Sequence, residues 1–196
     1  MRVILILTCA IILQLNQQAH SQEAQKNEVY AAKIITLKKK DQALRKEYGE
    51  ALKTETVTDS VKNAISKMDM VHNALLENLV RKYGYPNASE VGMEATHAFW
   101  ILAMHQDKNP TFQEGVLTWM REAVKRKDAL TRDLAYLEDR VSVNRGECQL
   151  YGTQVDYDDS SKKYFSFPIC DLKKMKKLRK KMKLMTLDRQ LEQENQ

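Results

Sequence analysis

The chain has few of the residues that are typical of irregular or membrane-embedded proteins. Only six Gly and three Pro occur in 196 residues, which argues against a loop-rich or disordered protein. The strongest apolar run, from Val3 to Leu13, is much shorter than the roughly 20 residues that a membrane-spanning helix needs. No later segment is apolar enough to span a membrane, so we expect a soluble mature chain without a transmembrane segment.

Catalytic signatures of the common enzyme classes are also missing. The sequence has no Walker loop, no dinucleotide-binding glycine fingerprint, no nucleophile elbow, no paired CxxC and no HExxH. These absences remove the enzyme classes that such motifs identify. We therefore expect no cofactor and no bound metal.

The first residues have the three parts of an export signal. Arg2 supplies positive charge, the apolar run follows, and a polar stretch ends with small residues at Ala19 and Ser21. The apolar run is too short for an anchor, and too little of it precedes Cys9 for a lipoprotein. We interpret residues 1–21 as a signal peptide cleaved after Ser21, and we expect an exported protein, periplasmic or extracellular.

Positive charge is concentrated toward the C-terminal end. The formal net charge is +6, and eleven Lys or Arg lie from Lys162 to Arg189 against only Asp171 and Asp188. Such a segment suits an anionic partner. For an exported protein we expect no nucleic acid, whereas anionic lipid, lipopolysaccharide, cell-wall polymer or a protein are better candidates. A solvated helix face is the alternative, and the oligomeric state is not indicated.

Two cysteines, Cys148 and Cys170, remain after the expected cleavage. An even number of cysteines in an oxidising compartment suggests a disulfide. It would close a loop of about twenty residues and stabilise the fold by roughly 3 kcal/mol. Two unpaired buried thiols are the alternative.

The spacing of apolar residues predicts a mainly α fold, a bundle of about five or six helices with a small β-hairpin in the C-terminal third. A polar helix is expected within 22–58, with a partial apolar stripe at Val29, Ala32, Ile35 and Leu37. The helical domain follows at 59–187, and a polar tail at 188–196. Short runs rich in Tyr, Phe and Val on either side of a polar turn predict the hairpin at about 149–169.

Further helices are expected at about 61–83, 91–106, 111–127, 129–143 and 171–183. The clearest stripe belongs to the first of these: Val61, Ile65, Met68, Val71, Leu75, Leu76, Leu79 and Val80. Thr58, Asp59 or Ser60 can cap it, and Gly84 suits its end. Ser89 is expected to cap the apolar central helix at 91–106.

Two histidines lie on this central helix. His97 and His105 are eight residues apart, which is about 80° and 12 Å on a helix, so one metal is poorly placed to bind both. Each can be a buried, hydrogen-bonded side chain or a general acid/base, since imidazole suits proton transfer at neutral pH. Metal ligation by His105 with Asp107 is a further alternative.

Three other polar features are candidates for a site. Asp139 and Arg140 are adjacent and point about 100° apart on a helix, so they form either an ion-pair network or an orienting carboxylate with an anion-binding guanidinium. The segment Tyr151-Gly152-Thr153-Gln154 supplies compact polar groups at a strand start, or else a bulge. Asp69 and Asn73 lie one turn apart, where a local hydrogen bond is the ordinary interpretation.

From about Asp69 to Leu187, the chain resembles a bacterial family, domain-of-unknown-function family 6624, in a series of motifs and in their order. The motifs are Asp69…Asn73, Tyr83-Gly84-Tyr85-Pro86, His105-Gln106-Asp107, Asp139-Arg140-Val141, Tyr151-Gly152-Thr153-Gln154 and Ile169-Cys170-Asp171. The chain departs from the family pattern at Tyr85, where the family has Trp, and at Met104 and Gln106, where it has Gln and Ala. The resemblance implies site residues and no established activity.

We therefore predict a polar groove in which His105 is the acid/base, Asp107 or Asp139 orients it, and Arg140 holds an anionic or carbonyl group. Substrate contacts are expected from Tyr151, Thr153, Gln154, Asp69 and Asn73. The ligand would be a small polar molecule or an envelope component, and the sequence leaves open whether the protein is an enzyme. The alternative is a non-catalytic envelope protein that binds a partner or anionic surface through its basic C-terminal helix.

Overall fold

The fold is mainly α with one small hairpin, as the sequence predicts. The computed structural model describes residues 2–54, 56–158 and 160–195, with backbone only for residues 2–13 and 53. The elements in these ranges are α1 Arg2–Lys53, α2 Asp59–Tyr83, α3 Ala88–Val91, α4 Met93–Met104, α5 Pro110–Lys125, α6 Thr131–Asn144, β1 Val155–Asp158, β2 Lys163–Ser166, α7 Leu172–Lys181 and α8 Leu187–Glu194.

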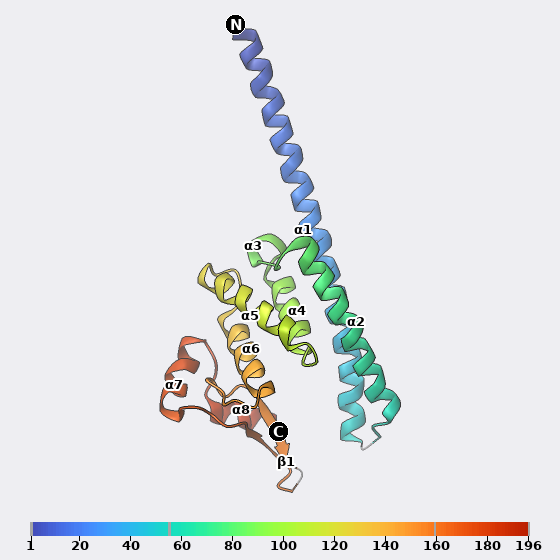
Figure 1. The fold of residues 1–196 in the computed structure, drawn as a ribbon, viewed down its shortest axis with the longest axis vertical. Helices are drawn as coiled ribbons and strands as arrows, with labels where there is room; N and C mark the ends of the chain where they lie inside the picture. The colour runs from blue at the N-terminus through green and yellow to red at the C-terminus, as the bar shows by residue number, and fades with distance from the viewer. Residues whose placement is uncertain (1, 55, 159, 196) are drawn as a thin grey trace.

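A long helical hairpin forms one side of the molecule. In Figure 1, α1 extends well beyond the body at its N-terminal end, while its C-terminal half lies beside α2 and packs against α4. The helices α4, α5 and α6 form the centre, and α7, α8 and the β-hairpin form the other side. The core between these parts is built on fully buried side chains that include Ile34, Leu76, Phe99, Leu102 and Leu137.

The ends of α2 follow the predicted signals. The side chain of Thr58 accepts a hydrogen bond from the backbone N–H of Val61, which caps the helix start. Gly84 ends the helix with φ 81°, and its N–H donates to the carbonyl of Val80. A residue with a side chain disfavours that φ, so glycine suits this position.

The predicted central helix at 91–106 is wrong in one respect, because Gly92 divides it. Gly92 has φ 80°, outside the helical region, so the short α3 ends at Val91 and α4 begins at Met93. Ser89 therefore lies inside α3 and does not cap the central helix, and Asn87 precedes α3.

The apolar stripe expected on α1 is also displaced. Tyr30 and Ile34 are the buried residues of this part of α1, whereas Val29 is 44% exposed. The apolar run of the predicted signal peptide lies outside the residues whose side chains are described. Among the described residues, no helix combines the length and the apolar character needed to cross a membrane.

The β-hairpin is shorter than predicted. β1 and β2 pair antiparallel from Val155 with Ser166 to Asp158 with Lys163. The preceding segment Tyr151–Gln154 is an irregular buried loop, not the start of a strand. Most of its backbone hydrogen bonds are to buried side chains, and the carbonyl of Gln154 accepts one from the N–H of Phe167 at 3.3 Å.

A disulfide joins Cys148 to Cys170, which are 22 positions apart in sequence and have their Cα atoms 5.1 Å apart. It connects the segment before the hairpin to the segment that leads into α7. The hairpin is therefore closed covalently at its base, which confirms the predicted pairing.

The basic C-terminal segment contains two helices. Asp171 caps α7 by accepting hydrogen bonds from the N–H groups of Lys173 and Lys174, both at 3.0 Å. The expected polar tail lies mostly in a second helix, α8, which the sequence analysis did not predict. α8 buries Gln190 against the molecule.

Candidate functional site

The short loop between α4 and α5 holds two of the predicted site residues, His105 and Asp107. Three hydrogen bonds fix this loop from both sides. The side chain of Gln113 donates to the carbonyl of Ala103 at 3.0 Å, and the side chain of Asn109 accepts from the N–H of Phe112 at 3.1 Å. The N–H of Asn109 also donates to the carbonyl of Gln106 at 2.8 Å. His105 and Asp107 are therefore held on a rigid turn.

His105 is bonded to a carboxylate that the sequence analysis did not identify. Its Nδ1 lies 3.0–3.1 Å from the two carboxylate oxygens of Asp41, on α1. Asp41 is fully buried, whereas the His105 side chain is 21% exposed. An ionised carboxylate only accepts hydrogen bonds, so Nδ1 carries the hydrogen and Nε2 of the neutral ring is the basic atom. No described residue hydrogen-bonds to Nε2.

Two further side chains hold Asp41 in its ionised form. Arg45 Nε donates to it at 3.1 Å, and Gln42 Nε2 donates at 2.9 Å. Burial alone would raise the pKa of Asp41, but the hydrogen bond and charge of His105, together with Gln42 and Arg45, lower it below its usual value. Arg45 also pairs with Asp69 on α2, whose pKa burial raises.

A second histidine, His72 on α2, faces the same carboxylate. Its Nδ1 lies 3.9 Å from Asp41 and has no hydrogen-bond partner among the described residues. Burial lowers the pKa of His72, although the charge of Asp41 opposes this shift. His72 is therefore expected to be neutral at pH 7, which leaves Arg45 as the fixed cation beside Asp41.

A cavity of about 410 Å³, lined mostly by polar residues, opens beside His105. Its volume is that of a small-molecule pocket. Its walls come from α2 and from the loop between α4 and α5: Ser66, Asp69, Met70, Asn73, His105, Gln106, Asp107, Lys108 and Asn109. Lys108 Nζ donates to the hydroxyl of Ser66 at 2.8 Å across the cavity, and Asn109 donates to Asn73 at 3.1 Å.

Asp107 links this cavity to two other predicted residues. Arg140 binds Asp107 through two hydrogen bonds, Nε to Oδ1 at 2.9 Å and Nη2 to Oδ2 at 2.5 Å. Arg140 Nη1 donates to the side-chain oxygen of Gln154 at 3.2 Å. Burial would raise the pKa of Asp107, but the bonds and charge of Arg140 lower it, with help from Asn144 and Gln113. Asp107, Arg140 and Gln154 therefore form one connected group.

Asp139 lies apart from this group in a sealed environment. It is fully buried and accepts hydrogen bonds from the N–H groups of Leu150, Tyr151 and Thr153 at 2.8–3.2 Å, and from the Thr153 hydroxyl at 2.9 Å. Burial raises the pKa of Asp139, while these bonds act in the opposite direction. Asp139 therefore anchors the Tyr151–Gln154 loop.

The carbonyl groups of the same loop are bound from the other side. Arg179 of α7 is buried, and its Nη1 donates to the carbonyls of Tyr151 and Gly152 at 2.8 and 3.1 Å. Gln190 of α8 donates to the carbonyl of Thr153 at 3.0 Å. The basic helix α7 therefore contributes one arginine to the interior while its lysines stay outside.

His97 forms a second histidine–carboxylate pair elsewhere. Its Nδ1 lies 2.6 Å from Asp133 on α6, and its ring stacks on Trp100 with centroids 5.0 Å apart. His97 lines neither the cavity beside His105 nor any other cavity described below. The two pairs have the same chemistry, but only His105 lines the cavity beside the loop between α4 and α5.

The predicted residues Asp69 and Asn73 both line the His105 cavity but do not bond to each other. Asp69 pairs with Arg45, and Asn73 donates to Glu77 at 3.4 Å. Sequence reasoning missed Asp41, although a signal was present. Asp41 continues the spacing of the buried Tyr30 and Ile34 on α1, and a carboxylate within a buried stripe indicates a specific partner. Among the described residues, no group of three or more His, Cys, Asp or Glu could hold a metal ion.

Comparison with known families assigns most of the chain. A model described as a family of unknown function (DUF6624) matches residues 29–191. This match confirms the resemblance carried by the motifs, and it extends far enough toward the N-terminus to include Asp41 and Arg45. Searches among curated proteins and among solved structures found no match.

Proposed function

We propose that this chain, which belongs to the DUF6624 family of unknown function, is an exported enzyme that uses His105 as general acid/base on a small polar molecule. The observation that carries the proposal is the buried Asp41 bonded to Nδ1 of His105 at the wall of a polar cavity. A carboxylate in this position fixes the tautomer and the orientation of the ring. Nε2 can then take a proton from a water or hydroxyl group bound in the cavity.

The other cavity residues supply ligand contacts in this proposal. Asn73 and Asn109 offer amide groups, and Lys108 offers a cation for an anionic or carbonyl group. Asp107 lines the cavity, and its ion pair with Arg140, which is about one-third exposed, can exchange part of its bonding for a ligand. Asp139, Tyr151 and Thr153 act indirectly, because their loop places Gln154 against Arg140.

Export is part of the same proposal. The three-part leader supports it, and so does the Cys148–Cys170 disulfide, which is typical of proteins in oxidising compartments. The substrate would then be a polar component of the cell envelope. An N-terminus at Gln22 in the protein recovered from the culture medium or periplasm would support this part of the proposal.

The test is turnover by matched histidine variants. We expect the wild type to consume at least one small polar species in an envelope extract, followed by mass spectrometry before and after incubation. His105→Gln should slow that consumption by about 10²- to 10⁴-fold, the range for loss of a general acid/base. His97→Gln is the control, because it removes the same kind of histidine–carboxylate pair outside the cavity. Equal loss in both variants, or none in His105→Gln, would refute the proposal.

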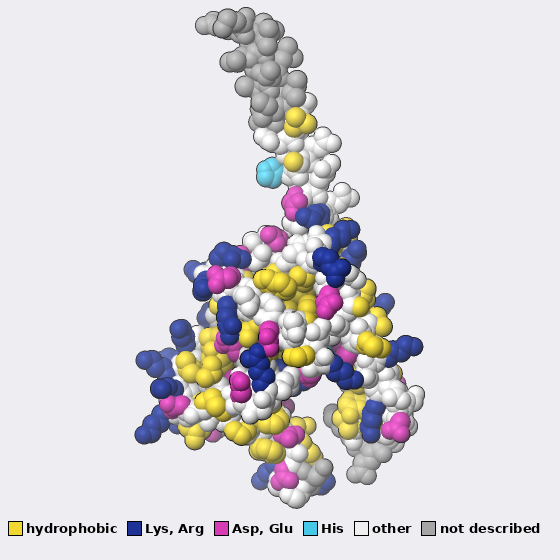
Figure 2. Space-filling view, in the orientation of Figure 1, with side chains coloured by type: hydrophobic (Ala, Val, Ile, Leu, Met, Phe, Trp, Pro, Cys, Tyr) yellow, Lys and Arg dark blue, Asp and Glu magenta, His cyan; other side chains and the backbone are white. Residues whose placement is uncertain are grey.

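One surface supports a second candidate, binding to an anionic surface. The lysines of α7 are all exposed, and Lys and Arg side chains gather at this edge of the molecule in Figure 2. Among the described residues, one lysine of α7 forms an ion pair: Lys174, with Asp171 at 3.4 Å. Protein that turns over nothing, yet binds anionic vesicles and is released by salt, would favour this candidate.

A further inference from the structure

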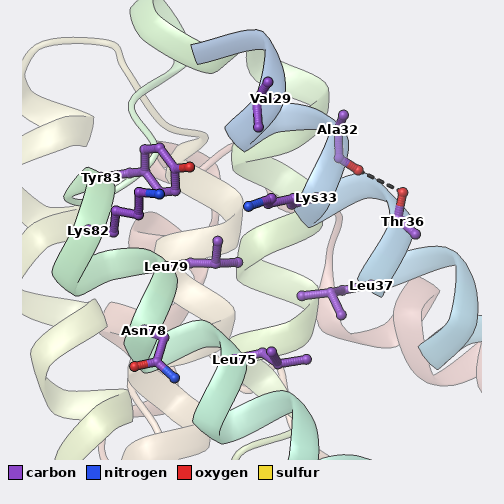
Figure 3. A pocket seen from close by; sticks show the side chains of 10 residues that line it. All are labelled: Val29, Ala32, Lys33, Thr36, Leu37, Leu75, Asn78, Leu79, Lys82 and Tyr83. Atoms are coloured by element: carbon purple, nitrogen blue, oxygen red, sulfur yellow. Dashed lines mark hydrogen bonds between the residues drawn. The ribbon is translucent and has the colours of Figure 1, made fainter. Parts of the chain in front are cut away.

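An open groove of about 630 Å³ runs between α1 and α2 and shares no lining residue with the His105 cavity. Most of its length is apolar. Figure 3 shows the side chains that form it: Val29, Ala32, Lys33, Thr36 and Leu37 from α1, and Leu75, Asn78, Leu79, Lys82 and Tyr83 from α2.

The groove collects apolar residues that helix packing leaves uncovered. Val29 and Leu37 belong to the stripe expected on α1, and Leu75 belongs to the stripe expected on α2. In the structure Val29 is 44% and Leu75 41% exposed. The core instead contains Tyr30 and Ile34 of α1 and Leu76 of α2. Two neighbouring helices therefore both present apolar side chains to one groove, and contiguous exposed apolar surface marks an interaction site.

Two ammonium groups meet at one end of this groove. The Nζ atoms of Lys33 and Lys82 lie 5.8 and 5.2 Å from the ring centroid of Tyr83, which stacks on Tyr30. Neither lysine forms an ion pair with a described residue. In Figure 3 both head groups lie near Tyr83, whereas Leu37 and Leu75 lie farther along. The groove thus has a cationic end and an apolar end.

Beyond the lysines the surface becomes polar. A smaller adjoining hollow shares Val29, Lys82 and Tyr83 with the groove and adds Gln22, Gln25 and Lys26. The apolar part extends from Lys33 to Leu37 on α1 and from Lys82 to Leu75 on α2, which is roughly 6 to 10 Å along the helices. Along α1 the lining therefore changes from polar to Val29, then to the cationic Lys33, and then to the apolar Leu37.

We infer that this groove binds a fatty-acid-like molecule, a single aliphatic chain with a carboxylate head. The head lies between Lys33 and Lys82, where it supplies the anion that the two ammonium groups lack. The chain lies along Leu79, Leu75 and Leu37. The volume of the groove, about 630 Å³, is within the range of small-ligand sites. This inference concerns a separate site and does not depend on the acid/base role of His105.

Calorimetric titration with sodium decanoate, below its micelle concentration, tests the inference. We expect one decanoate per chain and an affinity that rises about fourfold per methylene from hexanoate to decanoate. Decyltrimethylammonium should bind at least about tenfold more weakly, because its head is cationic. Lys33→Gln with Lys82→Gln should weaken decanoate binding by about tenfold or more, since both charge-assisted contacts are lost.

Matched variants separate the groove from general effects. Lys38→Gln with Lys39→Gln removes the same charge from α1 outside the groove and should leave binding unchanged. Leu75→Gln changes a half-exposed position, so the fold should persist by circular dichroism while decanoate binding falls. Equal binding of the anionic and cationic amphiphiles, or wild-type affinity in Lys33→Gln with Lys82→Gln, would overturn the inference. A dimer by light scattering with no decanoate bound would overturn it too and assign the groove to self-association.

Discussion

Asp139→Asn is expected to lower the free energy of unfolding by about 3 to 5 kcal/mol. Asp139 is fully buried and accepts bonds from three backbone N–H groups and one hydroxyl. An asparagine amide can accept at only one of its two positions, so its NH₂ group would face N–H donors. Urea unfolding of the two proteins measures the difference.

Asp107→Asn is the matched control for this result. Its carboxylate also receives several hydrogen bonds, but its side chain is 39% exposed and water can replace the lost contacts. The expected loss is below about 1 kcal/mol. If Asp139→Asn cost no more than Asp107→Asn, Asp139 would not be the anchor of the Tyr151–Gln154 loop.

Asp41→Asn is expected to lower turnover by up to as much as His105→Gln does, a decrease of about 10²- to 10⁴-fold in kcat/KM. The amide can present its NH₂ group to Nδ1 and so favour the wrong tautomer of His105. Because Asp41 and His105 would act as one unit, the double variant Asp41→Asn with His105→Gln should be no slower than His105→Gln alone. Multiplicative losses in the double variant would show that the two side chains act independently.

The same substitution has a pH-dependent effect on stability. The folded protein lowers the pKa of Asp41, so its carboxylate stabilises the fold above the unfolded pKa of about 3.9. That contribution is lost as the pH falls through the lower folded pKa. Below pH about 5, the difference in unfolding free energy between wild type and Asp41→Asn should therefore shrink as the pH falls. A difference that grew on acidification would contradict the assigned direction.

Local signals in the sequence predicted much of the fold. Thr58 and Gly84 mark the ends of α2 through capping and a positive φ, which depend on neighbouring residues alone. Cys148 and Cys170 were paired because only two cysteines follow the leader. The break at Gly92 was missed because an apolar run on both sides resembled one continuous helix.

The candidate site was predicted less completely, for a physical reason. His105 and Asp107 are two residues apart, but the turn places His105 against Asp41 and Asp107 against Arg140. Asp41 is 64 residues from His105 in sequence, so only the packing of α1 against α4 brings the pair together. The burial of Arg179 was not predicted, since most of its partners are backbone carbonyls that carry no sequence signature.

The central claim is that Asp41 fixes His105 with hydrogen on Nδ1 and leaves Nε2 as the base. Nitrogen-15 NMR of the histidine side chains in the folded, mature protein reads this tautomer directly and needs no substrate. We predict that neutral His105 carries its hydrogen on Nδ1, that this preference is lost in Asp41→Asn, and that it persists in Asp133→Asn, which alters only the His97 pair. A His105 ring with its hydrogen on Nε2, or a tautomer unchanged by Asp41→Asn, would contradict the claim.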